Sequence, residues 1–542
     1  MKTDERSPGT AWSPLRIPVF RTIWTANLVS NTGTWLSMVG TTWLMTLIAP
    51  SPLMVSLVQA ASTLPVFVFA LPAGALADIV DQRRLLIGLQ SFMGVVAALL
   101  WATVMLGRAT PIVVLAATFL TGIGAALAAP AFQSIVPDLV PRQELRTAIT
   151  LNGVGINVSR AIGPAVAGML IPAFGIASPF LLNALSFIPA IAAFQRWKAP
   201  ARQTDLPGER FSSAIRTGLR YTREAPELRA TLVHAGAFFL FASGYWALLP
   251  LIARDRLGGE AASYGVLLGC LGVGAIAGAF ALPKIRRSTS ADIVVLTASL
   301  VTAAIITAVV FVRNLAVAAP LMAVAGACWI AVLSTLNVAA QVALPAWVKA
   351  RGLSVYLLVF NGGLAFGSPL WGFVANRLGM PLALAISASG LAAAALVVLR
   401  WKLPAADVSN LAPSMHWPAP LVALEDLEAE KGPVMIEIEY RIDPAQQVAF
   451  SQALQELGRV RRRDGAIFWQ HFVDVSDPAR NIEVFMLESW LQHLRQHERV
   501  TVADQPIQDR ALTFHIGDSP PRVMHLVAEN ARQEPAWTSR KS

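Results

Sequence analysis

The stretch GALADIVDQRR, residues 74–84, decides the fold, because a second version of it, GAFALPKIRRS, occupies residues 278–288. The two stretches share Gly, Ala, Ala and Arg at positions that lie 204 residues apart. The same offset relates Pro141 to Pro345 and Gly163-Pro164 to Gly367-Ser368-Pro369. A repeated, almost wholly apolar unit of this size predicts a membrane transporter of two similar halves, with its substrate site where the halves meet.

The composition also favours a membrane protein. Of the 542 residues, 55% are hydrophobic and 14% are charged, whereas soluble proteins carry about 25% charged residues. The formal net charge of +10 is uneven, because Lys and Arg are in excess over residues 1–404 and Asp and Glu over residues 405–542. A basic soluble chain would suggest a nucleic-acid partner. Here the basic residues lie in short loops between apolar spans, so we expect no nucleic-acid binding and interpret these residues as determinants of membrane orientation.

Twelve spans are apolar and reach the length of about 20 residues that a membrane helix needs. They cover residues 22–48, 53–77, 85–106, 111–136, 146–172, 178–197, 229–252, 262–283, 291–312, 316–342, 351–375 and 381–400. The chain start lacks a cleavable signal sequence, so the first span is expected to direct insertion. Because the loops on the side of the N-terminus are richer in Lys and Arg, we expect a multi-pass all-α protein with both termini in the cytoplasm.

The spans and the composition changes between them predict six segments. These are a first six-helix half (1–197), a cytoplasmic linker (198–228), a second half (229–402), a second linker (403–432), a soluble domain (433–530) and a disordered tail (531–542). In the first linker, Phe211, Ile215, Leu219 and Tyr221 recur at near-helical spacing beside arginines. That spacing predicts an amphipathic helix on the inner leaflet, with a solvated basic linker as the alternative.

The soluble domain is expected to be a small α+β unit. MIEIEYRI, from Met435, alternates with the period of two of a half-buried strand. A helix at about 444–461, strands at AIFWQHFV and IEVFMLES, a helix from Trp490 to about Val502 and a strand at RVMHLVAE follow. The order β-α-β-β-α-β is typical of the ferredoxin-like arrangement.

GALADIVDQRR resembles the signature loop that follows the second helix in the major facilitator superfamily. The resemblance implies twelve membrane helices in two pseudo-symmetric halves, and a gating role for Gly74, Asp78, Arg83 and Arg84, with Asp78 latching the halves in one access state. Asp81 stands where that family usually has Gly, and the second copy has Leu282 in place of Asp78. The alternative is that these are ordinary loop charges that obey the orientation rule.

A second gating motif lies in the fifth and eleventh spans. Gly163, Pro164 and Gly168, and the corresponding Gly367 and Pro369, resemble a helix-bending motif of exporters in this superfamily. Proline removes one backbone hydrogen bond, and small residues let helices approach closely. Generic packing is the alternative, because Gly and Pro are frequent in membrane helices.

Arg160 is a charged residue near the middle of the fifth span, close to Asn157. A charge at that depth costs about 2.5–3.5 kcal/mol on insertion scales, so it indicates a functional site by default. We expect Arg160 to face a central cavity and bind an anionic or catechol-like group. The alternative is a structural arginine bonded to carbonyl groups or to Asn157.

Further cavity residues are expected in the first, fourth, seventh and tenth spans, which line the cavity in the superfamily. The aromatic and amide side chains at mid-depth there are Asn31, Trp35, Phe238, Phe241, Tyr245, Trp329 and Asn337. Aromatic rings at these positions could stack on a flat ligand, although each one alone is equally consistent with packing.

The energy source is not defined by a buried acid, because no Asp or Glu lies deep within a span. Proton coupling would use Asp78, His234 or the substrate itself. No GxxxxGK[ST] motif is present, so ATP is not expected to drive the protein directly. Cys270 and Cys328 lie inside spans and form no metal-ligand pattern, and we expect neither a metal nor a cofactor.

The order of features is similar to that of the transmembrane secretion effector family, to which enterobactin exporters are similar. FRTIWTANLVSNTGTWLSMVGTTWLM (20–45) and VPDLVPRQELRTAITLNGVGINVSRAIGPAVAG (136–168) carry the resemblance, which we place over residues 12–405. It implies proton-driven export of siderophores, drugs or other anionic or amphipathic small molecules through the inner membrane of bacteria. A lysophospholipid or sugar carrier on the same fold is an alternative.

FMLESWLQHLRQHERVT (485–501) resembles the antibiotic-biosynthesis-monooxygenase-like dimeric α/β barrels. That resemblance implies dimerisation through the soluble domain. Trp469, His471, His493 and His497 would be the candidates for an oxygenase site that modifies the transported molecule, which makes a bifunctional protein the alternative to a plain transporter. A dimerisation or regulatory module with surface histidines is the simpler interpretation, because a fold does not decide an activity.

Overall fold

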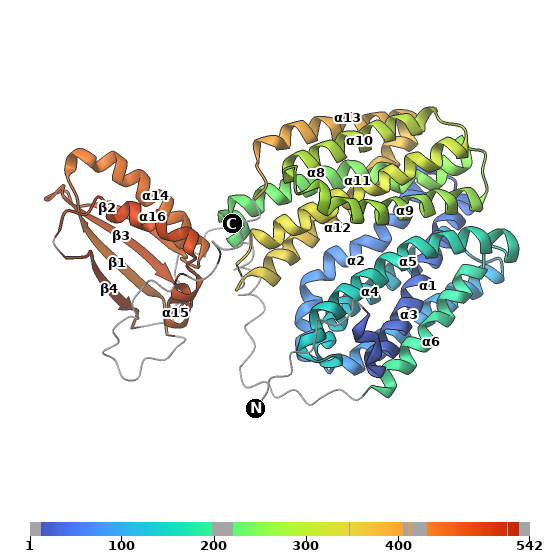
Figure 1. Cartoon of the computed structure of the whole chain (residues 1–542), viewed down its shortest axis with the longest axis horizontal. Helices are drawn as coiled ribbons and strands as arrows, with labels where there is room; N and C mark the ends of the chain where they lie inside the picture. Colours follow the sequence, from blue (N-terminus) through green and yellow to red (C-terminus); the bar gives the residue numbers. More distant parts are fainter. Residues whose placement is uncertain are drawn as a thin grey trace, which may run out of the picture. The chain divides into compact units, whose positions relative to one another are not determined.

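The computed structural model describes residues 12–197, 220–345, 347–404, 411, 414, 431–517 and 519–529. Two groups of six long helices dominate Figure 1. The first group is α1 (Pro18–Ile48), α2 (Pro52–Ile79), α3 (Gln82–Met105), α4 (Pro111–Leu139), α5 (Leu145–Phe174) and α6 (Ser178–Arg196). The second group is α8 (Pro226–Leu251), α9 (Ala261–Ile285), α10 (Ala291–Phe311), α11 (Leu315–Val342), α12 (Lys349–Leu378) and α13 (Met380–Val397).

The helix boundaries follow local sequence signals. Proline occupies the first turn of α1, α2 and α4, where its missing N–H leaves no hydrogen bond unmade. Ser51, Thr110 and Ser290 cap the starts of α2, α4 and α10. In each case the hydroxyl accepts a hydrogen bond from the backbone N–H three residues later. The predicted spans are therefore confirmed as helices, with ends that extend by a few residues into the connections.

The repeat is visible in the helix starts. α4 begins at Pro111 and α11 at Leu315, whereas α5 begins at Leu145 and α12 at Lys349, so both pairs keep the offset of 204 residues. The two halves thus share a backbone plan as well as a sequence pattern, which confirms the duplication.

Eleven helices in the described part of the chain are long and apolar enough to cross a membrane. The 31-residue helix α1 has sufficient length but does not meet that criterion of hydropathy. Apart from Thr22 and Thr25 near its start, which are exposed, its Ser, Thr and Asn side chains are half-buried or buried, and the helix packs against α5 and α6. A polar helix is tolerated in a membrane protein when other helices cover it.

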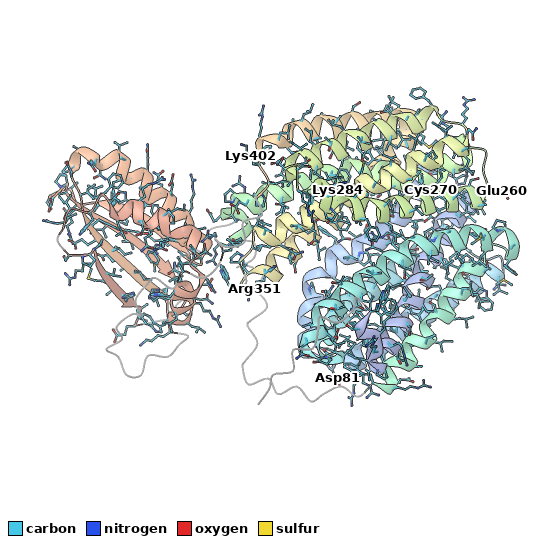
Figure 2. The ribbon with its side chains drawn as sticks, viewed as in Figure 1. Asp81, Glu260, Cys270, Lys284, Arg351 and Lys402 are labelled. Atoms are coloured by element: carbon cyan, nitrogen blue, oxygen red, sulfur yellow. The ribbon has the colours of Figure 1, made fainter. Side chains whose placement is uncertain are left out.

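The bundle has two ends. The end that carries the α2–α3 and α9–α10 connections, with Arg84 and Arg287, is called the basic end here, and the other is called the opposite end. Figure 2 shows Asp81 at the basic end of the first half and Glu260 at the opposite end of the second.

The two halves meet where α5 lies beside α9 (Figure 1). A Cβ atom added at Gly168 would lie 2.9 Å from the Cα atom of Gly265, so this crossing requires a residue without a side chain. Farther along the same pair, a Cβ atom at Gly272 would lie 2.9 Å from the Cα of Ala161. The crossing therefore runs from mid-depth to the opposite end.

The soluble domain contains β1 (Val434–Arg441), α14 (Gln447–Arg463), β2 (Phe468–Val473), β3 (Arg480–Leu487), α15 (Trp490–Arg499), α16 (Gln505–Leu512) and β4 (Arg522–Val527). Its sheet has the order β2-β3-β1-β4, and every pair of neighbours is antiparallel. This topology confirms the expected ferredoxin-like arrangement.

One face of this sheet is covered by helices, because β1 and β3 bury every second side chain. Val434, Ile436, Phe450, Leu454 and Phe485 form the centre of that core. The residues between them belong to the uncovered face of the sheet.

The predicted helix from Trp490 to Val502 is wrong at its end. α15 stops at Arg499, and the chain then forms a capping box in which the hydroxyl and backbone N–H of Thr501 both donate to Asp504. That box starts a short 3-10 turn and α16, which the sequence did not lead us to expect.

Several expectations lie outside the described residues. They are the amphipathic helix at Phe211, Ile215 and Leu219, most of the second linker and the tail at 531–542. Compact units also differ from the expected domains: residues 220–229 and 339–355 group with the soluble domain, and the remaining membrane helices form the other unit.

Candidate functional site

Arg160 lies at the middle of α5, where the contact between the halves begins. Its guanidinium carbon is 5.4 Å from the centre of the Trp35 ring on α1. The Nε atom is buried and has no hydrogen-bond partner in the described part of the chain. A buried N–H group without a partner is costly, and a cation over an aromatic face is partly stabilised. The pair is therefore suited to receive an anionic or hydrogen-bond-accepting group at that nitrogen.

Trp35 also lines a pocket between the halves. The first half contributes Trp35, Met38, Val39, Thr42, Val55 and Gln59, and the second contributes Trp246, Ala247, Tyr264 and Leu268. Most of these side chains are apolar or aromatic, with Gln59 and Thr42 as the polar groups. Such a lining is typical of sites for amphipathic small molecules.

An aromatic row continues from this pocket into the second half. The rings of Trp246 and Trp329 stack at 5.1 Å with an angle of 21°. Trp329 in turn packs against Phe238 at 5.8 Å and Phe239 at 5.3 Å. Of the predicted cavity residues, Trp35 is thus at the pocket itself, whereas Trp329 and Phe238 lie in its supporting layer.

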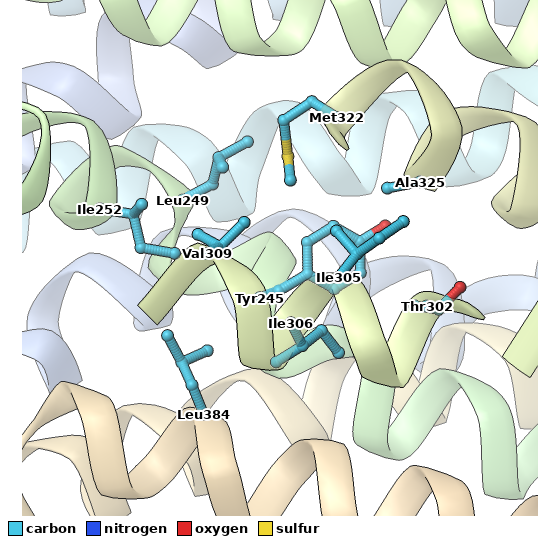
Figure 3. Close-up of a pocket in the computed structure, with 10 residues that line it drawn as sticks. All are labelled: Tyr245, Leu249, Ile252, Thr302, Ile305, Ile306, Val309, Met322, Ala325 and Leu384. Atoms are coloured by element: carbon cyan, nitrogen blue, oxygen red, sulfur yellow. The ribbon is translucent and has the colours of Figure 1, made fainter. Parts of the chain in front are cut away.

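Other predicted site residues lie elsewhere. Tyr245 lines an apolar pocket inside the second half, among residues of α8, α10, α11 and α13 (Figure 3), and no described residue forms a hydrogen bond with its hydroxyl. Phe241 packs on Trp371 at 5.8 Å. Asn157 is exposed and donates to the Gly153 carbonyl, so the alternative that it holds Arg160 has no support in the contacts. Asn31 and Asn337 are half-buried on α1 and α11.

The sequence analysis missed Trp246, Gln59 and Tyr264. Trp246 follows directly after the predicted Tyr245, and one step along a helix turns a side chain by about 100°. The aromatic density of the seventh span was the right signal, but depth alone did not decide which ring faces the other half. Gln59 gave a weaker signal, as one amide in an apolar span.

Four further contacts between the halves lie between mid-depth and the opposite end. Trp43 and Tyr264 stack at 6.2 Å. Arg254, in a π-helical turn after α8 (Ile252–Arg256), donates from Nη1 to the Thr46 carbonyl at 2.5 Å. Glycines of α12 adjoin α2, because a Cβ atom at Gly372 would meet Ser56 and one at Gly362 would meet Phe67.

These contacts, with the α5–α9 crossing, close the opposite end. The bundle therefore holds the Arg160–Trp35 pair on the side of the crossing that faces the basic end.

The signature loop shows a local structural role for two of its residues. Asp81 caps α3 by accepting a bond from the backbone N–H of Arg84 at 2.8 Å. Arg83 donates from Nε to the Phe194 carbonyl at 2.9 Å and from Nη2 to the carbonyl of Gln195, which ties the loop to the end of α6. For Gly74 and Asp78 the structure describes only the backbone, as part of α2, so their gating role stays a prediction.

The glycine–proline motifs occupy different surroundings in the two halves. In α5, a Cβ atom at Gly163 would lie 2.5 Å from the Cβ of Trp35, and Gly168 meets the other half. In α12, Gly367 adjoins Leu240 and Ser243 of its own half. Pro164 and Pro369 lie inside their helices as expected. The motif therefore serves close packing in both halves, and its gating role stays a prediction.

His234 is buried, and its Nε2 lies 2.9 Å from the Trp401 carbonyl. This bond anchors the start of α8 to the chain that follows α13. Cys270 and Cys328 are free thiols, and no group of three potential metal ligands occurs among the described residues.

The four aromatic and histidine candidates of the soluble domain are not brought together. Trp469 and His471 lie on β2, where they bond to Glu483 at 3.0 Å and Asn481 at 2.8 Å. His493 and His497 lie on α15, and the His493 ring is 4.8 Å from that of His525 on β4. Because β2 and β4 are opposite edges of the sheet, a single site built from all four residues is not formed.

The comparison with known families identifies the chain. It belongs to the transmembrane secretion effector family, whose sequence model matches residues 9–534. The match extends through the soluble domain, so our expectation that the resemblance ends near residue 405 is corrected.

Two relatives with described roles align with parts of the chain. The staphyloferrin A transporter of Staphylococcus aureus is 24% identical over 47% of this chain and 64% of its own length. The multidrug efflux pump Tap of Mycolicibacterium fortuitum is 27% identical over 64% of this chain and 86% of its own length. The chain thus spans just under two thirds of the length of the first relative.

Solved structures share the fold at low sequence identity. The nucleoside transporter NupG superposes with a TM-score of 0.61 at 8% identity, covering 71% of this chain and 99% of that one. A bacterial homolog of the human lysosomal transporter Spinster, inward-facing and occupied, gives a TM-score of 0.56 at 14% identity, covering 73% and 98%. The membrane part is therefore a multi-pass bundle with the fold of these transporters.

Proposed function

We propose that the protein is a secondary transporter that exports small organic molecules carrying an anionic or hydrogen-bond-accepting group beside an aromatic or apolar body. The observation that carries this proposal is Arg160, with its buried, unpartnered Nε beside the Trp35 ring. Siderophores and amphipathic drugs have this chemistry. The two relatives above are named as a staphyloferrin A transporter and a multidrug efflux pump, which supports substrates of these classes.

Export would proceed by alternating access. The crossing of α5 and α9 and the Arg254–Thr46 bond hold the opposite end together. We infer that this arrangement is the state that opens at the basic end, toward the cytoplasm, and that rocking of the halves exposes Arg160 to the other side.

Both termini would lie in the cytoplasm, in the inner membrane of a bacterium, because the basic connections lie at one end of the bundle. The driving force would be a proton gradient, as the family resemblance implies. No described membrane helix places a carboxylate at mid-depth, so the proton would move on His234, on Asp78 or on the substrate.

The test uses inverted membrane vesicles that contain the full-length protein. Uptake of a catecholate siderophore driven by an imposed pH gradient is expected for the wild type. Arg160→Ala should reduce uptake by about a hundredfold, as expected for loss of a charge-assisted bond in a dry site. Arg160→Lys should retain part of the activity, because it keeps the charge.

Arg377→Ala is the matched control. Arg377 also stacks on an aromatic ring, that of Phe373 at 5.5 Å, but it is exposed at the opposite end of α12. Equal uptake by Arg160→Ala and the control would exclude Arg160 as a substrate-binding residue. If a lysophospholipid or a sugar inhibits the uptake and other siderophores or drugs do not, the alternative of a lysophospholipid or sugar carrier would be favoured instead.

We also propose that the soluble domain dimerises through the uncovered face of its sheet. Phe468 and Phe472 of β2 and Leu526 of β4 are more than two fifths exposed on this face. Ile482 and Val484 of β3 lie between them. Glu437 and Glu439 of β1 share this face with the apolar side chains. Exposed apolar side chains that lie together, as on β2 and β3, normally mark an interaction surface, and a second sheet is the covering that the dimeric barrel resemblance implies.

The dimer is tested by the mass of the purified full-length protein in nanodiscs. Phe472→Asp should lower the dimer fraction by about tenfold, because it places charges in the apolar contact. Val448→Asp is the control, because Val448 is 72% exposed on α14, on the other side of the sheet. A dimer fraction that both variants leave unchanged would place any association elsewhere.

A further inference from the structure

The soluble domain makes a dense set of contacts with the chain segments that begin or end membrane helices. Residues 220–229 lead into α8, and residues 339–355 include the end of α11 and the start of α12. Both segments belong to the same compact unit as the soluble domain. Two short connections of the second half are therefore held by groups from the far end of the sequence.

Two cations flank two adjacent aromatic rings at the centre of this contact. The guanidinium carbon of Arg499 is 4.6 Å from the centre of the Trp347 ring, and that of Arg463 is 5.8 Å from the Tyr221 ring. The Trp347 and Tyr221 rings meet edge to face at 5.8 Å. The arginines come from the soluble domain and the rings from the helix ends. We call these four residues the clamp.

Hydrogen bonds within the soluble domain hold the Arg499 side chain in the position where it contacts Trp347. Its Nη1 donates to the Asp464 carbonyl at 2.8 Å and its Nη2 to Gln492 at 2.9 Å. Burial lowers the pKa of Arg499 to about 10, with Asp464 acting in the opposite direction, yet the group stays charged at neutral pH. A planar guanidinium can donate bonds from its edge and stack through its face, which a lysine cannot do.

Arg463 is fixed in the same way. It pairs with Asp464 at 2.9 Å and with Asp504 at 2.6 Å. Tyr221, which it covers, donates its hydroxyl to the Ala343 carbonyl at 3.1 Å. That bond joins the segment before α8 directly to the end of α11.

A second layer strengthens the contact at the end of α14. Arg220 donates to the Gly465 carbonyl at 2.6 Å and lies 3.5 Å from Glu488. The carbonyls of Asp464 and Gly465 follow the last turn of a helix, where cations are favoured by the helix dipole. Gly465 has φ of +133°, a backbone conformation that favours glycine, and a Cβ there would lie 2.9 Å from Nη1 of Arg499.

We infer that the soluble domain is a regulatory clamp on the basic ends of α8, α11 and α12, and that the clamp stabilises the state open at that end. The contacts of the clamp are independent of the proposed transport function, whereas its effect on access rests on that function. A clamp formed in one access state adds its binding free energy to that state alone. Any ligand or partner that distorts residues 461–465 or 488–499 would then shift access without touching the substrate site.

The test uses the full-length protein in nanodiscs, with Trp347→Ala and Arg499→Lys as the clamp variants. Hydrogen exchange reports on the amides of Val348 and Gly352, which donate to Pro345 at 3.2 Å and Val348 at 2.9 Å. Loss of a desolvated cation–aromatic contact should speed this exchange by at least about tenfold. Arg510→Ala is the control, because it removes an exposed ion pair with Glu456 in the same domain.

Access is measured by the distance between spin labels at Gln143→Cys and Ser288→Cys, two exposed residues at the basic end, one in each half, with Cys270 and Cys328 replaced by serine. The clamp variants should shift the distribution toward shorter distances and change the transport rate at least about threefold, whereas the control should do neither. Arg499→Lys keeps the buried charge, so it answers the question if Trp347→Ala fails to fold.

Exchange and distances that match the control in both clamp variants would overturn the clamp, whatever the transport assay gives. A protein that transports none of the tested compounds, but whose distances shift in the clamp variants, would retain the clamp and refute the proposed function.

Discussion

The membrane bundle and the soluble domain treat a buried arginine in opposite ways. In the soluble domain, Arg461 pairs with Glu483 at 3.2 Å, with both side chains at most 4% exposed. Tyr440 and Trp469 also donate to that carboxylate. In the bundle, the Nε of Arg160 has no partner among the residues that the structure describes. A buried charge with a complete set of partners is structural, whereas one that lacks a partner is available for a ligand.

The two sequence repeats sharpen this contrast. The position of Arg160 in the first repeat corresponds to Leu364 in the second, and that of Trp35 to Phe239. Both halves keep the glycines that allow close helix packing, but only one keeps the charge. The glycines occur in both halves because helices pack closely in both. The charge occurs in one half because a single substrate needs only one charged group.

The largest effect on stability is expected for Arg461→Ala in the soluble domain. Removing one partner leaves Glu483 buried and unpaired, which costs about 3–5 kcal/mol. Hydrogen exchange of the β1 and β3 amides in the full-length protein would measure this loss. Arg510→Ala removes an exposed pair and should cost no more than about 1 kcal/mol. Equal losses in the two variants would remove the contrast between paired and unpaired arginines.

Leu364→Arg would place a second cation at mid-depth in the bundle. Leu364 is 5% exposed, and the insertion cost is about 2.5–3.5 kcal/mol. The melting temperature of the purified protein should fall accordingly, and the change should not restore transport to Arg160→Leu. The volume-conserving Leu364→Met should cost less than about 1.5 kcal/mol. Restored transport would show that the two positions are interchangeable.

His493 gives the soluble domain an acid sensitivity. Burial, with the nearby His497 and His525, lowers its pKa to about 3. Between pH 6.5 and 3 the unfolded chain therefore binds a proton that the folded domain does not, so stability falls as the pH falls, by about 2 kcal/mol at pH 5.

Burial raises the pKa of Asp464 to about 6, so the folded domain binds this proton more tightly than the unfolded chain. As the pH falls through 6, Asp464 therefore adds stability and partly offsets the loss from His493. The comparison of wild type with His493→Leu isolates the histidine, since Asp464 is common to both. Hydrogen exchange at pH 7.5 and pH 5 should show the wild type losing stability relative to the variant. A constant difference at the two values would contradict the depressed pKa.

The smallest effect on stability is expected for Arg160→Leu, although it should abolish transport. Because the guanidinium lacks a partner at Nε, removing it should leave the melting temperature unchanged or raise it. The gain in stability should not exceed the insertion cost of the charge, about 2.5–3.5 kcal/mol. Arg377→Ala should change neither property. A destabilisation as large as that of Arg461→Ala would identify Arg160 as structural.

Much of the fold followed from local pattern. Apolar length, proline and the repeat gave twelve helices within a few residues of their observed ends, and the alternation in VMIEIEYR gave β1. The end of α15 was missed, because a capping box between Thr501 and Asp504 outweighed the apparent continuation of the helix. Boundaries set by one side-chain bond are not visible in a pattern of hydrophobicity.

The site was predicted less completely. Arg160 and Trp35 could be singled out by type and depth, but Trp246 could not be preferred over Tyr245, because that choice depends on the rotation of α8 against its neighbours. The separation of His471 from His493 likewise follows from strand order, since β2 and β4 lie at opposite edges. The clamp joins Tyr221, Trp347 and Arg499, which no spacing in the sequence relates.

The sequence by itself determined that this chain is a duplicated bundle of membrane helices followed by a small α+β domain, because hydrophobic length and period act over neighbouring residues. Only the tertiary structure decided which aromatic rings face the other half, which buried arginines have partners and which helix ends the soluble domain holds. These depend on contacts between residues far apart in the chain, where helix rotation and strand order determine which side chains meet.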